Sequence, residues 1–169
     1  MVPRRGRGHP TAGRARQHPG PHQVRLADLF DEAGARMRRE GFQFAYHNHD
    51  FEFAPLEGQV PYDLLLERTD ARAVKLEMDL YWTVKGGASP VEYFGRQPGR
   101  FHLLHVKDMD ATPRRFFADV GKGVIDFKTI FAHAQRAGVR HYFVEHDEPP
   151  GSPFESLKVS IDYLRRLEF

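Results

Sequence analysis

Four short apolar runs in this chain each end in a residue type that binds divalent cations. The runs cover residues 44–47, 74–79, 101–105 and 141–145. Their last residues, at spacings of 32, 26 and 40 residues, are His47, Asp79, His105 and Glu145. If the runs are neighbouring parallel strands, their carboxyl ends meet at one edge of the sheet. Two imidazoles and two carboxylates at that edge predict a site for a divalent cation.

Helix signals lie between the apolar runs. Apolar residues recur at helical spacing over residues 25–40, and Gly41 stands where such a helix would end. Ser89 followed by Pro90 predicts a helix that begins there and reaches about residue 96. Further helices are predicted over residues 62–67, 126–137 and 152–167, and strands over residues 42–49, 74–80, 101–107 and 141–145.

Strand and helix thus alternate four times, with roughly 30 residues in each unit. This alternation predicts an α/β fold with a parallel sheet whose functional loops follow the strands. A doubly wound sheet uses the same units, but the glycine-rich phosphate fingerprint expected after its first strand is absent. The segment Gly121-Lys122-Gly123 is not a P-loop, because it lacks the glycine spacing and follows no strand.

Length and composition limit the class of protein. The chain has 169 residues, of which 40% are hydrophobic, and this length favours one domain over two. It has no cysteine, which excludes disulfides and thiolate metal sites and fits a reducing, cytoplasmic location. No apolar run approaches the roughly 18 residues that span a bilayer, and the N-terminus lacks the apolar core of a secretory signal. We therefore expect a soluble cytoplasmic protein with no membrane partner.

Residues 1–24 differ in composition from the rest of the chain. They hold five arginines, four glycines, four prolines and no acidic residue. Such a segment has too little apolar surface to offset its ordering entropy, so we expect a disordered tail before one domain over residues 25–169. An arginine-rich tail can contact nucleic acid or direct targeting, but aromatic interleaving and an amphipathic period are both missing. A non-native or misassigned start is the simpler explanation, and we expect no nucleic-acid partner.

Five motifs, taken in order, resemble those of the sugar phosphate isomerase/epimerase family of xylose-isomerase-like TIM barrels. They are YHNHDFEF at residues 46–53, EMDLYW at 77–82, LHVKD at 104–108, VGKGVIDF at 120–127 and VEHDEP at 144–149. The resemblance covers about residues 25–169. It implies a partial (β/α)8 TIM barrel, of which this chain holds about four parallel βα units of the C-terminal half.

The resemblance also implies a divalent metal, often Mn, Mg, Co or Zn, held at the ends of the last four strands by Glu, Asp, His and Glu. Asp79, His105 and Glu145 match the second, third and fourth ligands. His47 stands at the first position, where many relatives have Glu, and Glu52 is the alternative ligand there.

The activity implied by the resemblance is isomerisation or epimerisation of a small-molecule sugar or sugar derivative. A proton is removed next to a carbonyl through an enediolate, with Glu145 as the base and Lys107 or His49 assisting at the oxygen. In epimerase relatives the two Glu ligands form the acid/base pair, so His47 in place of one of them argues against a two-base epimerisation. A lyase or dehydratase acting on a keto sugar or inosose shares the first step, and a non-catalytic fragment is a further alternative.

For the residues beside the candidate ligands, the sequence allows two interpretations each. By strand period Glu77 shares the face of Asp79, where it would accept a hydrogen bond from a ligand or pair with Lys75 or Arg72. Two aromatic residues, Tyr81 and Trp82, either form a wall of the sugar site by stacking on the apolar face of the sugar or pack in the core.

The number of strands conflicts with a closed barrel. A complete barrel needs eight strands and about 250 residues, whereas four strands are predicted in this chain. The sheet then has two unpaired edges and an uncovered apolar face. Three explanations follow: a fragment of a longer gene product, which we favour, a homo-oligomer in which a second copy covers the open half-barrel, or an inactive relative.

Overall fold

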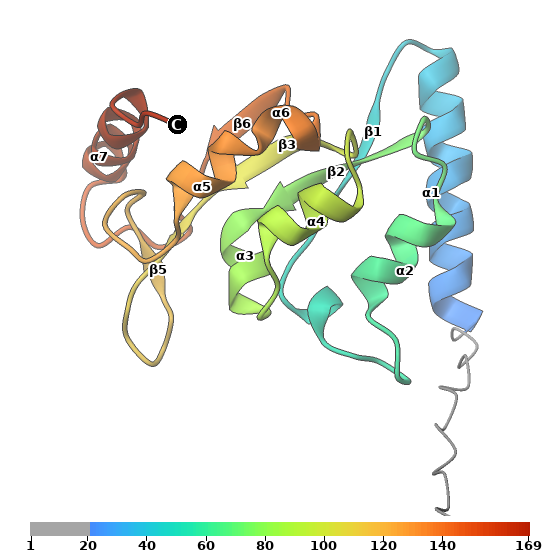
Figure 1. The fold of residues 1–169 in the computed structure, drawn as a ribbon, viewed down its shortest axis with the longest axis horizontal. Coiled ribbons are helices and arrows are strands. Elements are labelled where there is room, and N and C mark those ends of the chain that lie inside the picture. The colour runs from blue at the N-terminus through green and yellow to red at the C-terminus, as the bar shows by residue number, and fades with distance from the viewer. Residues whose placement is uncertain (1–20) are drawn as a thin grey trace, which may run out of the picture.

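Four parallel strands form the centre of the molecule in a computed structural model, which describes residues 21–169 (Figure 1). In sheet order they are β1 (Phe44–His47), β2 (Val74–Asp79), β3 (Phe101–Val106) and β6 (His141–Val144). The order in the sheet follows the order in the chain, as in successive units of a barrel. The predicted α/β fold with four parallel βα units is therefore confirmed.

Helices precede, connect and follow these strands. They are α1 (Pro21–Arg39), α2 (Pro61–Arg68), α3 (Leu80–Lys85), α4 (Pro90–Arg96), α5 (Phe127–Ala132), α6 (Ala134–Ala137) and α7 (Pro153–Arg165). A 3-10 turn, η1 (Phe51–Phe53), follows β1, and a short antiparallel pair, β4 (Asp108–Met109) and β5 (Phe117–Ala118), follows β3. Figure 1 shows α4, α5 and α6 along the same face of the sheet. Within residues 21–169, no helix combines the length and apolar character needed to cross a bilayer.

Helix α1 begins earlier than the sequence pattern indicates. It starts at Pro21, a residue type suited to the first helical turn, whereas the predicted start is residue 25. The predicted boundary between tail and domain at residue 24 therefore falls inside a helix. The predicted disorder of residues 1–20 concerns a segment outside the described residues.

Two other elements differ from the prediction. No helix is predicted directly after the second strand, yet α3 follows β2 without a loop. The Asp79 side chain accepts the Trp82 backbone N–H at 2.9 Å and so caps this helix. The predicted helix over residues 126–137 is two short helices that meet at His133, although Asp126 caps the first of them as expected. Neither difference changes the path of the sheet.

Alternation along the strands separates a packed face from an open one. On β2, Val74, Leu76 and Met78 are almost fully buried against the helices. The intervening residues point to the opposite face of the sheet. Burying side chains of this size contributes about 1.5–3 kcal/mol each, so packing on the helix-covered face stabilises the fold.

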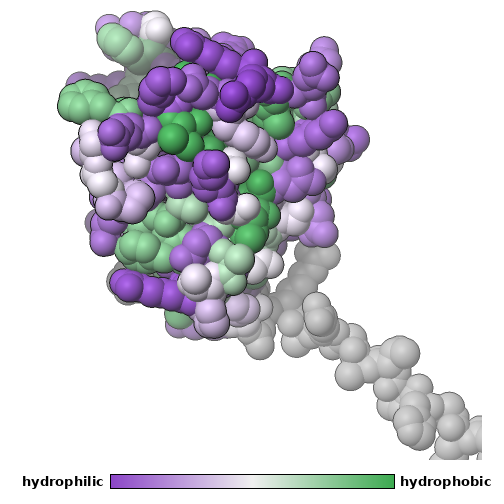
Figure 2. Space-filling model, turned by 90° about the vertical axis from the view of Figure 1, so that its left-hand side faces the viewer, coloured by the Kyte–Doolittle hydropathy of each residue, from purple (hydrophilic) through white to green (hydrophobic). Residues whose placement is uncertain are grey.

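The β6 edge of the sheet and helix α1 carry exposed apolar side chains. On β6, Tyr142 and Phe143 are 50% and 49% exposed, and on α1, Leu29 is 56% exposed. Figure 2 views the molecule from the α7 side and shows apolar groups set among polar ones on that face. Within the described residues no further strand pairs with β1 or β6.

A buried carboxylate fixes the loop between β5 and α5. Asp108 is 1% exposed and accepts backbone N–H groups from Gly121 at 2.9 Å, Gly123 at 2.9 Å and Ile125 at 3.1 Å. Gly123 must lack a side chain, because a Cβ atom there would lie 2.2 Å from the Met109 carbonyl oxygen. The loop is therefore held in one conformation against β4.

His102 on β3 gives the fold a dependence on pH. The residue is 8% exposed, and burial, aided by Lys75 and Arg140, lowers its pKa to about 4. Since the unfolded pKa is about 6.5, unfolding takes up a proton as the pH falls from about 6.5 towards 4, and stability is lost in that window.

We expect acidification from pH 7 to pH 4.5 to cost wild-type protein about 2 kcal/mol more than it costs a His102→Gln variant. Urea unfolding of both proteins at the two pH values measures the difference. Equal losses in the two proteins would contradict this assignment, because all other titrating groups are shared.

Candidate metal centre

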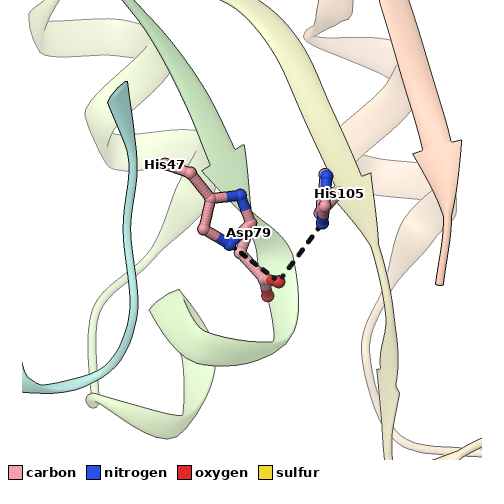
Figure 3. A group of neighbouring side chains, drawn as sticks. All are labelled: His47, Asp79 and His105. Carbon is pink, nitrogen blue, oxygen red and sulfur yellow. Dashed lines mark ion pairs between the residues drawn. The ribbon is translucent and has the colours of Figure 1, made fainter. Parts of the chain in front are cut away.

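Three of the predicted ligands meet at the carboxyl ends of β1, β2 and β3. One ligand atom from each of His47, Asp79 and His105 lies within 4.8 Å of the other two. The Asp79 Oδ2 atom is 3.6 Å from His47 Nε2 and 4.0 Å from His105 Nδ1 (Figure 3). Strand register produces this arrangement, because Asp79 is directly opposite His105 in the β2–β3 pair.

Asn48 holds the ends of β1 and β2 together. Its side chain is fully buried, accepts the Asp79 backbone N–H at 3.2 Å and donates to Thr83 Oγ1 at 3.2 Å. Asp79 Oδ1 is occupied as the cap of α3, which turns Oδ2 towards the two imidazoles. Sequence reasoning missed Asn48, although a polar residue directly after a strand and beside a candidate ligand was a usable signal.

The electrostatics of the three residues suit a cation. Burial raises the pKa of Asp79 to about 6, and within the described residues Oδ2 has only the long contact with Lys107 Nζ at 3.4 Å and no hydrogen bond of ordinary geometry. Burial, followed by the electrostatic influence of the neighbouring His105, His49 and Lys107 side chains, lowers the pKa of His47 to about 4, so its imidazole is neutral at pH 7. A neutral imidazole and an under-coordinated buried carboxylate are groups that a divalent cation satisfies. The residues present therefore fit a metal.

Glu145, the fourth predicted ligand, lies beside this group without joining it. Its Oε2 atom is 2.7 Å from His105 Nδ1 and 2.9 Å from Lys107 Nζ. Burial opposes ionisation, but the hydrogen bonds from Lys107 and His105 prevail and lower the pKa of Glu145. Glu145 is thus a carboxylate directed at the site, and its role as a ligand stays a prediction.

Glu77 takes the first of its two predicted roles. Its Oε1 atom is 2.9 Å from His105 Nε2. The alternative partners have other contacts, since Lys75 donates to the Gly99 carbonyl and Arg72 pairs with Asp70. Glu77 therefore orients the His105 ring from the side opposite Glu145.

Lys107 is the positive charge of the site. Its side chain is 5% exposed, and Nζ lies 3.4 Å from Asp79 Oδ2 and 3.0 Å from Asp147 Oδ1, in addition to its contact with Glu145. Burial disfavours the ammonium, yet these carboxylates raise the pKa of Lys107. The ammonium group of Lys107 therefore balances part of the negative charge of these carboxylates in the absence of a metal cation.

The aromatic residues divide between the site and the core. The His49 ring lies 5.3 Å from the His47 ring and 5.5 Å from the Trp82 ring. His49 and Trp82 therefore lie at the rim of the site. Tyr81 is fully buried and donates its hydroxyl to the Arg115 carbonyl, so it belongs to the core.

Glu52, the alternative first ligand, is not part of the group. It is 3% exposed and accepts hydrogen bonds from the Tyr46 hydroxyl and the His49 backbone N–H. Both of its oxygens are thereby used to fix the turn after β1.

A comparison with family models decides the affiliation of the chain. The model described as xylose isomerase-like TIM barrel matches residues 6–167. This chain belongs to the xylose isomerase-like TIM barrel family. The resemblance inferred from the five motifs is confirmed.

Relatives in this family include sugar-modifying enzymes. An inosose dehydratase of Lacticaseibacillus casei is 28% identical in an alignment of length 159 that covers 83% of this chain and 53% of the relative. The crystal structure of a sugar phosphate isomerase/epimerase from Parabacteroides distasonis has 35% identity and a TM-score of 0.71, covering 85% of this chain and 53% of that one. The chain thus spans about half the length of the relatives it matches.

A zinc-containing structure shares the fold. The IOLI protein, whose structure holds a bound zinc atom, is 16% identical with a TM-score of 0.65, covering 86% of this chain and 55% of that protein. At this identity the likeness concerns the fold alone.

Proposed function

We propose that this chain carries the metal-binding half of an enzyme that removes a proton next to a carbonyl in a sugar or sugar derivative. The observation that carries the proposal is the convergence of His47, Asp79 and His105 on one point, with Glu145 and Lys107 in contact beside it. A ligand group, a base and a hydrogen-bond donor at the carboxyl ends of barrel strands are the parts such a reaction needs.

The metal, one of Mn, Mg, Co or Zn, would be held by His47, Asp79 and His105, with Glu145 beside them as the fourth predicted ligand. A bound divalent cation would supply positive charge that polarises the substrate carbonyl. Its identity is set by availability as well as by these nitrogen and oxygen donors.

Glu145 is the proposed base. Its lowered pKa keeps it ionised at neutral pH, so its carboxylate can accept the proton from the carbon beside the carbonyl. Lys107 donates a hydrogen bond to Glu145 before substrate binds; transfer of that hydrogen bond to the substrate oxygen would leave Glu145 more basic. His49 stands at the rim with Trp82, where it can contact a second hydroxyl.

Two outcomes share this first step. With His47 where a second carboxylate base would stand, a single base favours isomerisation through an enediolate over a two-base epimerisation. Dehydration is the second candidate, and the similarity to an inosose dehydratase favours it.

Solvent exchange tests the proposal. We expect the chain with Mn²⁺ in D₂O to catalyse deuterium incorporation next to the carbonyl of a ketose or an inosose, and chelation of the metal to stop it. Nuclear magnetic resonance follows the exchange, and mass spectrometry detects loss of one water if dehydration occurs. Metal binding without exchange in any such substrate would identify a non-catalytic fragment and overturn the proposal.

The alternative to a longer gene product is a second copy that covers the open sides of the sheet. The chain has four parallel strands, whereas a barrel of this family closes with eight. If β1 of each copy pairs with β6 of the other, the dimer has eight strands and the exposed apolar residues at the sheet edges are covered.

The chain contains no cysteine, which permits a direct test of this pairing. We expect a solution mass about twice 19.5 kDa by light scattering. A chain with both Ala45→Cys on β1 and Phe143→Cys on β6 should form disulfide-linked dimers on mild oxidation, whereas each single variant should not. A monomeric mass with no cross-link would exclude the second copy and leave another chain or segment as the cover.

A further inference from the structure

Strand β6 is the least covered strand of the sheet, yet it delivers Glu145. His141, Tyr142 and Phe143 are exposed, and β6 has β3 as its neighbour on one side only within the described residues. Exposed edge strands with few buried contacts open more readily than central strands. The direction of the Glu145 side chain therefore depends on what anchors the chain directly after β6.

His146 provides that anchor. Its side chain is 6% exposed, and its Nε2 atom lies 3.5 Å from Oδ1 of Asp119, whose side chain is 17% exposed. Within the described residues neither ring nitrogen of His146 nor Asp119 Oδ1 has a hydrogen-bond partner. Burying such groups unpaired is unfavourable, and the approach of the imidazole to the carboxylate at 3.5 Å, without hydrogen-bond geometry, offsets only part of that cost.

Asp119 belongs to a segment that cannot shift easily. The backbone N–H of Val120 donates to Ser160 Oγ at 3.0 Å, and Asp108 binds the N–H groups of Gly121 and Gly123. The ring of Phe117 lies 6.3 Å from that of His146. His146 is thus attached to a loop that is itself fixed to β4 and α7.

Alternation along the chain gives the two neighbours of His146 the opposite direction. Glu145 contacts His105 and Lys107, and Asp147 also contacts Lys107. Fixing His146 outward therefore holds both carboxylates inward.

We propose that Asp119 and His146 are positioning residues, whose contact directs Glu145 towards His105 and Lys107. The inference rests on the proposed function only because that function makes Glu145 the base. The placement of Glu145 by His146 can be measured in metal-free protein without turnover.

Hydrogen exchange gives the first test. In metal-free protein we expect His146→Leu and Asp119→Ala to speed exchange of the backbone amides of residues 144–147 by at least about tenfold. Exchange in β2 and β3 should stay at the wild-type rate. His146→Gln, which keeps a donor for Asp119, should restore slow exchange, and the control Asp162→Ala, which removes an exposed carboxylate on α7, should change nothing. Unchanged exchange, or an equal rise in all strands, would overturn the inference.

Metal affinity gives the second test. Titration calorimetry with Mn²⁺ should show about a tenfold weaker affinity for His146→Leu than for wild type, the size usual for residues that orient a metal site. In a Glu145→Gln background the same substitution should cause no further loss, because it acts through Glu145. Additive losses would overturn the inference. If wild-type protein binds no Mn²⁺, the proposed function fails, and the exchange measurement alone decides the role of His146.

Discussion

Asp79→Asn is expected to weaken Mn²⁺ binding by more than about 100-fold, since substitutions that merely orient a ligand already cost about 10–100-fold. The amide of Asn is neutral and a poorer metal ligand than a carboxylate. Its oxygen can still accept the Trp82 N–H that Asp79 accepts, so α3 keeps its cap. Titration calorimetry measures the affinity, and far-ultraviolet circular dichroism verifies the fold.

His105→Ala should cause a loss of similar size, because it removes a nitrogen on the other side of Asp79 Oδ2. The matched control is Asp70→Asn, which changes an exposed carboxylate paired with Arg72 far from the group. Wild-type affinity in both Asp79→Asn and His105→Ala would show that cations bind elsewhere and would remove the basis of the proposed enzyme.

Glu145→Gln is expected to slow deuterium exchange next to the substrate carbonyl by about 10²–10⁴-fold, the usual contribution of a general base. Gln has nearly the same volume and retains a hydrogen bond to His105 or Lys107, but it cannot take up the proton. Mn²⁺ affinity should fall less than in Asp79→Asn, since Glu145 lies outside the three-residue group. Exchange rates at saturating Mn²⁺ separate the two effects.

The control for this substitution is Glu155→Gln, a neutralised carboxylate in the first turn of α7. It should retain wild-type exchange. A Glu145→Gln enzyme that exchanges as fast as wild type would assign the base to another group, and His49 would be the next candidate.

Local patterns in the sequence were sufficient to predict the sheet. Each strand is a short apolar run, and β2 adds period-two alternation at Val74, Leu76 and Met78; such runs need no long-range information to be recognised. Because parallel strands end at one edge, the meeting of His47, Asp79 and His105 followed from the strands alone.

The details of the site depended on contacts that no local pattern contains. The role of Asn48 arises from hydrogen bonds to residues more than 30 positions away, and helix α3 starts where it does because Asp79 caps it. Glu52 was a reasonable alternative ligand by position, but the Tyr46 hydroxyl turns it away from the group. Such choices are made by tertiary packing, which overrides propensity.

The two oxygens of Asp79 serve different ends, and this has an evolutionary consequence. One oxygen starts a helix and the other faces the imidazoles, so a descendant that had lost turnover would still be selected to keep the acid for the sake of folding. Retention of aspartate at this position is therefore weak evidence that a homologue remains active. Histidine at positions 47 and 105, which caps no helix, is the better diagnostic.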